Sequence, residues 1–233
     1  TVGNDTMGGW NDYNYSQIMT NLTAYTSDDV ASATSMVDGL TASGATSADY
    51  GMQHAQTVLA SARDDAQKVV IFFTDGEPNH QNGFSSTVAN AAISAAKALK
   101  DENTLVYTIG MFADADPGNT DASTSNQFDA YMHAVSSNYP KASAWNSLGD
   151  RVSQDSAYYK AATNAAELNQ IFQEISDEIN AGTGLPTETI DGAEGTSGYI
   201  TFTDELGAYM EADSFKSIVF ADKVFSNPEK SSN

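Results

Sequence analysis

The order of hydrophobic and polar positions predicts strands that alternate with helices. Residues 69–73 are five consecutive apolar residues, all β-branched or aromatic, which predicts a strand buried on both faces. A second buried strand is predicted over 104–112 and a short one over 158–161. Apolar residues at helical spacing predict helices over 28–38, 48–63, 86–100, 126–137 and 164–180, the last with Asn164 and Glu167 as a capping pair.

This alternation predicts a doubly wound, mostly parallel α/β sheet of Rossmann-like type. The pattern breaks at Gly182–Pro186, and the strand-like runs 198–203 and 215–220 follow without helices between them. We therefore expect an α/β domain over residues 1–181 and a β-rich segment over residues 182–233.

The charge of the chain restricts its partners. It contains 31 acidic and 10 basic residues, which gives a formal net charge of −21. Such a surface repels nucleic acids and anionic membranes, and it attracts cations or basic partners. The chain has no cysteine, so a disulfide framework and a thiolate metal site are both excluded.

Two loops combine glycine with side chains that carry oxygen. One contains Gly44 and Thr46, and the other follows the strand at 69–74 and contains Asp75 and Gly76. Open α/β sheets bind ligands beyond the carboxyl ends of their strands, where Asp75 is expected. Mg²⁺ is commonly held by one or two carboxylates with hydroxyls and waters, so Thr46 and Asp75 suit it. From this segment alone, an Asp that only caps the turn is an equally good interpretation.

These loops carry a resemblance to a known family. Gly44–Thr46 with its following helix, and then Phe73–Pro78, resemble the von Willebrand factor type A domain, in particular that of Gram-positive cell-surface and pilus-tip adhesins. The segments 107–110 and 166–172 support the resemblance. Residues 200–210 resemble the start of the β-rich stalk module that follows such domains.

The resemblance implies a metal-ion-dependent adhesion site. In that family three loops hold a cation, usually Mg²⁺ or Mn²⁺, and an acidic residue of the bound partner completes the site. By resemblance, Thr46 is the ligand of the second loop and Asp75 that of the third, while Gly44 and Gly76 allow tight turns. The neighbours that would influence the choice of partner are Glu77, Asn79 and His80.

One part of the family pattern is missing. Its first metal loop, Asp-x-Ser-x-Ser, ends the first strand, and no such motif precedes Thr46. Residues 121–125 match the letters, but they lie in a polar loop downstream of Asp75, where a solvated loop is the favoured interpretation. We therefore expect an N-terminally truncated domain in which strand 69–74 exposes its edge and a hydrophobic face. Such a chain should bind metal poorly and be marginally stable or prone to association.

The resulting hypothesis is a non-enzymatic, extracellular adhesion module of a bacterial surface, attached to the cell wall through parts of the protein outside this chain. Its partners would be host or extracellular proteins that present an acidic residue, or other pilus subunits. One alternative is a metal-dependent hydrolase with Glu77 or His80 as general base. Another is a structural spacer with an inactive site.

Three further sets of residues are weaker candidates. Zinc would need the three histidines, whose spacing matches no compact site, and Ca²⁺ would need an acidic loop that lacks the EF-hand order. Lys216 or Lys223 could form an isopeptide bond, although an exposed strand lysine is favoured. The residues of the zinc and calcium hypotheses are His54, His80, His133, Asp114, Asp116 and Asp121.

Overall fold

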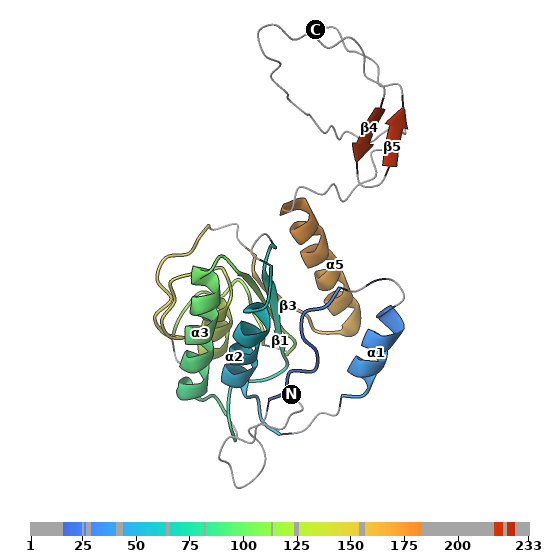
Figure 1. The fold of residues 1–233 in the computed structure, drawn as a ribbon. Coiled ribbons are helices and arrows are strands. Elements are labelled where there is room, and N and C mark those ends of the chain that lie inside the picture. The colour runs from blue at the N-terminus through green and yellow to red at the C-terminus, as the bar shows by residue number, and fades with distance from the viewer. Residues whose placement is uncertain are drawn as a thin grey trace, which may run out of the picture. The chain divides into compact units, whose positions relative to one another are not determined.

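A computed structural model gives the fold (Figure 1). The chain divides into two compact units, Thr1–Phe172 and Gln173–Asn233. The structure describes residues 16–24, 26, 29–40, 44–63, 66–81, 83–112, 114–123, 126–153, 157–182, 217–220 and 223–226.

The first unit is built on a three-stranded parallel sheet with the order β1-β2-β3. Its strands are β1 (Val69–Thr74), β2 (Leu105–Gly110) and β3 (Tyr159–Ala161). In the register, Val69 lies opposite Leu105, and Thr108 lies opposite Tyr159. All three predicted strands are therefore confirmed, and so is their parallel arrangement.

The helices also lie where the sequence predicts them. The amphipathic pattern gives an α/β, Rossmann-like arrangement in which α3 connects β1 to β2 and α4 precedes β3. Figure 1 shows α2 and α3 side by side next to the sheet. The helices are α1 (Val30–Asp38), α2 (Ala48–Leu59), α3 (Ser86–Asp101), α4 (Gln127–Val135) and α5 (Ala165–Gly182).

The main core lies between the sheet and the helices α2, α3 and α4. Helix α3 carries a row of fully buried small residues, Ala89, Ala92 and Ala96. These short side chains allow neighbouring elements to approach the helix closely. The aromatic rings of Phe84, Tyr131 and Trp145 meet edge to face beside this row, in the geometry that aromatic quadrupoles favour.

Local hydrogen bonds fix several helix ends. Ser85 caps α3, because its hydroxyl accepts a hydrogen bond from the Val88 N–H. Asn164 caps α5 by accepting from the Ala166 and Glu167 N–H groups at 3.0 Å each. The Glu167 carboxylate accepts in turn from the Thr163 N–H at 2.7 Å, which lowers the pKa of Glu167. The predicted capping pair is therefore confirmed.

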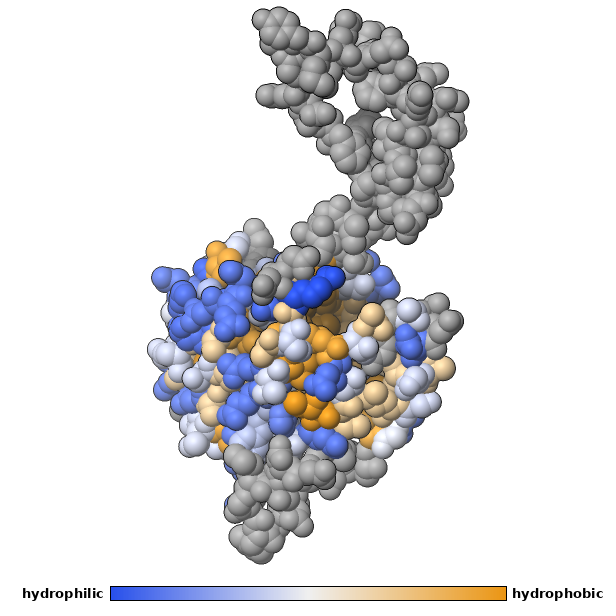
Figure 2. Space-filling model, viewed as in Figure 1, coloured by the Kyte–Doolittle hydropathy of each residue, from blue (hydrophilic) through white to orange (hydrophobic). Residues whose placement is uncertain are grey.

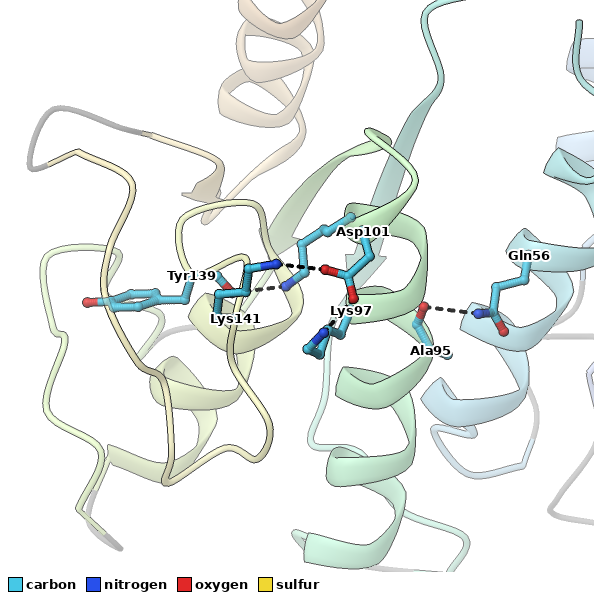
Figure 3. A network of polar contacts seen from close by, with 7 residues as sticks. Gln56, Ala95, Lys97, Asp101, Tyr139 and Lys141 are labelled. Atoms are coloured by element: carbon cyan, nitrogen blue, oxygen red, sulfur yellow. Dashed lines mark hydrogen bonds and ion pairs between the residues drawn. The ribbon is translucent and has the colours of Figure 1, made fainter. Parts of the chain in front are cut away.

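A polar network joins the end of α3 to the segment that follows α4 (Figure 3). The buried Lys100 ammonium donates to the carbonyls of Ala134, Ser136 and Tyr139, at 2.7, 3.0 and 3.1 Å. Nearby, Asp101 pairs with Lys97 and Lys141, which lower its pKa to about 2. The Gln56 amide donates to the Ala95 carbonyl at 3.2 Å and ties α2 to α3.

Burial differs between the two long strands. Residues 106–110 of β2 are all buried, as predicted. The prediction that residues 69–73 are buried on both faces is wrong, because Ile71 and Phe73 are 39% and 46% exposed. The physical reason is that the core covers only one face of β1. Val70 and Phe72 pack against it, whereas the opposite face is open and β1 lies at the edge of the sheet among the described residues.

Helix α1 is exposed as well. Its expected apolar face contains Val30 and Val37, which are 61% and 63% exposed, and none of the helix residues is buried. Figure 2 shows apolar surface on the side of the molecule where Figure 1 places α1 and β1. The first unit therefore exposes several large apolar side chains to solvent on this side.

The second unit contains an antiparallel pair, β4 (Ser217–Phe220) and β5 (Lys223–Ser226). The strand β4 lies within the predicted run 215–220, while the predicted run 198–203 lies outside the described residues. The two compact units divide after Phe172, within α5, and the expected domain boundary near 182 stays a prediction. No helix among the described residues is long and apolar enough to cross a membrane.

Candidate functional site

The structure places the two candidate loops next to each other. The Asn79 N–H, from the loop after β1, donates to the Thr46 carbonyl at 3.0 Å. Gly76 also lies close to Thr46, because a Cβ atom on Gly76 would be 3.5 Å from the Thr46 hydroxyl oxygen. Residues 30 positions apart in the sequence are thereby brought together at the carboxyl end of β1.

The backbone conformation of each loop has a specific physical cause. Gly44 has a φ of +83°, a conformation that glycine adopts without strain. In the other loop, the buried Thr74 hydroxyl donates to the Gly76 carbonyl at 2.9 Å and accepts from the Gly76 N–H at 3.3 Å. These bonds hold a tight turn directly around Asp75, whose side chain is exposed.

Two oxygen atoms near these loops are buried without a hydrogen-bond partner among the described residues. They are the Ser47 hydroxyl, which belongs to the residue after Thr46, and the Asn79 side-chain carbonyl. The Asn79 amide nitrogen donates to the Glu77 carbonyl at 2.8 Å, which fixes the side chain in place. Buried oxygens without a donor are costly, so water or a cation at this position would relieve them.

His80 is held by α2. Its Nε2–H donates to the Asp49 carboxylate at 3.0 Å, and its ring stacks on Tyr50 with 5.0 Å between ring centroids. Asp49 is buried in the first turn of α2. Burial and the Asp49 charge both raise the pKa of Tyr50. The sequence-predicted neighbour His80 is therefore engaged in fixing the loop against the helix.

A hollow of about 520 Å³ opens beside Asp75. It lies at the carboxyl ends of β1 and β2 and at the start of α4, the edge where α/β sheets bind ligands. Its described lining residues are Asp75, Gly76, Glu77, Phe112, Asp114 and Asn126–Asp129.

Asp129 anchors the wall of this hollow. Its carboxylate accepts from the Tyr159 hydroxyl at 2.7 Å and from the Asp116 N–H at 3.0 Å. Burial raises the pKa of Tyr159, and the hydrogen bond to Asp129 raises it further. Asp129 and Tyr159 were missed in the sequence, because the 30 positions between them hide the contact and neither belongs to a motif.

The weaker candidates have local roles. The Asp121 carboxylate accepts from Ser123 N–H and Asn126 Nδ2–H, near the start of α4. His133 is buried: its Nε2–H donates to the Pro117 carbonyl and its Nδ1 accepts from Asn138. Burial lowers the pKa of His133 to about 4. Within the described ranges, no three His, Asp or Glu side chains gather in a way that could hold a metal ion.

The residues present nevertheless fit a magnesium-type cation by donor type. Thr46 supplies a hydroxyl and Asp75 a single carboxylate, and the unpartnered oxygens of Ser47 and Asn79 lie on the same two loops. Mg²⁺ takes oxygen ligands, keeps several waters, and is often bound through only one or two carboxylates. A zinc site is a poor fit, because zinc prefers nitrogen and sulfur ligands in a closed tetrahedral arrangement.

Comparison with known proteins gives one match. The model of the von Willebrand factor type A domain matches residues 11–174, which include the whole sheet β1–β3, both candidate loops and the hollow. No curated protein and no solved structure matches the chain.

Proposed function

Because the chain belongs to the von Willebrand factor type A domain family, we propose that it is a binding module that holds a partner protein through a divalent cation. Domains of this family commonly serve adhesion and protein–protein interaction. The observation that carries the proposal is the adjacency of the Thr46 and Asp75 loops, joined by the bond from Asn79 to the Thr46 carbonyl.

In this proposal Thr46 and Asp75 hold Mg²⁺ or Mn²⁺, directly or through water. The bound ion offers a positive site that an acidic side chain of the partner completes. Thr74 keeps the turn around Asp75 fixed through its two bonds to Gly76. Gly44 and Gly76 let the two loops approach, while Glu77, Asn79 and His80 form the rim that a partner would meet.

The metal hypothesis is tested by isothermal titration calorimetry with MgCl₂ and MnCl₂. We expect weak, saturable binding, since the described residues of the site supply one carboxylate. Asp75→Ala should abolish the binding, whereas Asp38→Ala, which removes an exposed carboxylate at the end of α1, should leave it unchanged. Absence of saturable binding, or binding that survives Asp75→Ala, would contradict the proposal.

The binding hypothesis needs a partner assay. Collagen and fibronectin are suitable first probes, immobilised for surface plasmon resonance with MgCl₂ or with EDTA. Binding that EDTA removes, and that Asp75→Ala removes with Mg²⁺ present, supports a cation-dependent adhesion module. Binding that is indifferent to EDTA would contradict the cation-dependent mechanism, whereas no binding at all would favour the structural spacer.

By its resemblance to Gram-positive adhesins, we place the domain outside the cell, on a wall-anchored or pilus-tip protein, and assign it no catalytic activity. The hydrolase alternative requires a general base beside Asp75. His80 is one of the two candidates for this base. Its Nε2 atom is occupied by the hydrogen bond to Asp49, and its ring stacks on Tyr50. Substrate turnover that Asp75→Ala abolishes would establish the hydrolase instead.

A further inference from the structure

The His80 side chain joins the loop after β1 to the start of α2. Its Nε2–H donates to the buried Asp49 carboxylate at 3.0 Å. Its ring also stacks on Tyr50, with 5.0 Å between the ring centroids and 22° between the ring planes. Two different kinds of contact therefore fix this side chain against consecutive residues of one helix.

The Asp49–His80 pair lies next to the backbone bond between the two candidate loops. The Thr46 carbonyl accepts from the Ala48 N–H at 2.9 Å and from the Asn79 N–H at 3.0 Å, so both of its lone pairs are used. Asn79 directly precedes His80, and Asp49 lies three positions after Thr46. The Asp49–His80 pair therefore gives the two loops a second connection, through side chains, beside the backbone bond.

The start of α2 is built around this pair. Ser47 is the N-cap residue, but its hydroxyl makes no capping bond and is buried without a partner among the described residues. Asp49 is the acidic residue of the first turn, where the helix N-terminus favours negative charge. A buried carboxylate needs a hydrogen-bond partner, and His80 supplies it. The start of the helix is therefore tied to the loop after β1.

These connections determine how far apart the candidate ligands lie. Gly76, next to Asp75, is so close to Thr46 that a Cβ atom on it would lie 3.5 Å from the Thr46 hydroxyl oxygen. The turn around Asp75 is held by internal hydrogen bonds, and the Pro78 carbonyl accepts from the Ser85 N–H at 2.8 Å. The loop after β1 is thus firm in itself, so its contacts with the other loop and with α2 set its distance from Thr46.

We propose that Asp49 and His80 are positioning residues that make this site select Mg²⁺ over Ca²⁺, an inference that rests on the proposed function. Mg²⁺ requires near-octahedral oxygens at about 2.0–2.1 Å, whereas Ca²⁺ accepts a more flexible set at about 2.3–2.6 Å. Loops that are connected at two points favour the smaller ion, because they resist spreading to the longer distances of Ca²⁺. Neither residue is a ligand in this proposal. Both act by keeping the loops that carry Thr46 and Asp75 in place.

Calorimetric titration with MgCl₂ and with CaCl₂ tests the selectivity. Changes in residues that hold metal ligands in place commonly cost about 10–100-fold in metal affinity. We expect Asp49→Ala to weaken Mg²⁺ binding by about tenfold and Ca²⁺ binding by about twofold or less, so the preference for Mg²⁺ should fall by about fivefold.

Two variants control for other effects of the substitution. Asp49→Asn removes the same charge but keeps an oxygen acceptor for His80, so it should restore most of the preference for Mg²⁺. Glu167→Ala removes the first-turn carboxylate of α5 instead, and it should leave both affinities unchanged. A loss of preference caused by charge alone would appear equally in Asp49→Asn and in Asp49→Ala.

Amide hydrogen exchange without metal gives a second measurement. In EDTA, the Asn79 N–H should exchange about tenfold faster in Asp49→Ala than in the native chain, because the loop opens more often. The Thr108 N–H, which donates to the Tyr158 carbonyl at 2.8 Å within the sheet, should keep its native rate. A general loss of stability would accelerate both amides.

The outcomes separate this inference from the proposed function. A native chain without saturable Mg²⁺ binding would contradict the proposed function and, with it, the role of the Asp49–His80 pair in cation choice. If the native chain binds Mg²⁺, three results would each overturn the inference alone. They are an unchanged preference in Asp49→Ala, a lost preference that Asp49→Asn does not restore, and equal acceleration of the Asn79 and Thr108 amides.

Discussion

Lys100 gives the sharpest prediction about stability, because its charge lies inside the protein. The side chain is 9% exposed and burial lowers its pKa from 10.5 to about 7. Between about pH 7 and pH 10.5, Lys100 is therefore protonated in the unfolded chain but has lost its proton in the folded chain. Since the unfolded state binds more protons in this interval, the free energy of unfolding should rise with pH there.

The size of the effect follows from the two pKa values. One pKa unit corresponds to about 1.4 kcal/mol, so the contribution of Lys100 to stability should rise by about 3 to 4 kcal/mol from pH 7 to pH 10. The contact itself survives deprotonation in part, because a neutral amine retains two of its three N–H donors for the carbonyls of Ala134, Ser136 and Tyr139.

The assay is urea denaturation at pH 7, 8, 9 and 10, on the native chain and on Lys100→Met. Methionine keeps the length of the side chain but cannot titrate, so other groups contribute equally to both proteins. The difference between the two unfolding free energies should change in favour of the native chain as pH rises. A constant difference across this interval would refute the reasoning. Lys97→Met, which removes a half-buried lysine on the same helix, is the control. It should keep most of the native pH dependence, because Lys97 is the smallest of the three influences on the pKa of Lys100.

Three other expectations concern single contacts. In NMR titrations the His133 ring should stay neutral down to about pH 4, and stability should fall as pH drops from about 6.5 toward 4, because only the unfolded chain binds a proton there. Tyr159→Phe removes a buried donor to Asp129 and should lower the free energy of unfolding by about 1 to 3 kcal/mol in urea, with an unchanged circular dichroism spectrum. Asn164→Ala removes the α5 cap and should lower stability by about 1 kcal/mol, whereas Asn164→Asp should retain most of it.

Local patterns in the sequence were sufficient to predict the elements of the sheet. The runs at 69–74 and 105–110 are both apolar and β-branched or aromatic, so their strand character is a property of the segments themselves. Their different burial could not be predicted from the same letters. It depends on which strand has two neighbours and on which faces of the sheet are covered, and both are decided by tertiary packing.

The candidate site was predictable to a similar degree. Thr46 and Asp75 stand in recognisable loop motifs, and the structure brings those loops together through Asn79. The contacts that support them were not predictable, because they join distant positions by ordinary residues. Asp49 meets His80, and Tyr159 meets Asp129, without any signal in the local sequence.

The order of strands in the sheet also has a consequence for how the protein folds. Strands β1, β2 and β3 are neighbours in space in the order in which they leave the ribosome. Each new strand therefore joins the one made before it, and only α3 has to form before β2 can pair with β1. The connections are crossovers of 30 residues between β1 and β2 and of 48 residues between β2 and β3, so each parallel pairing forms more slowly than a hairpin would. Folding can still begin during synthesis and proceed by adding one strand at a time to the growing side of the sheet.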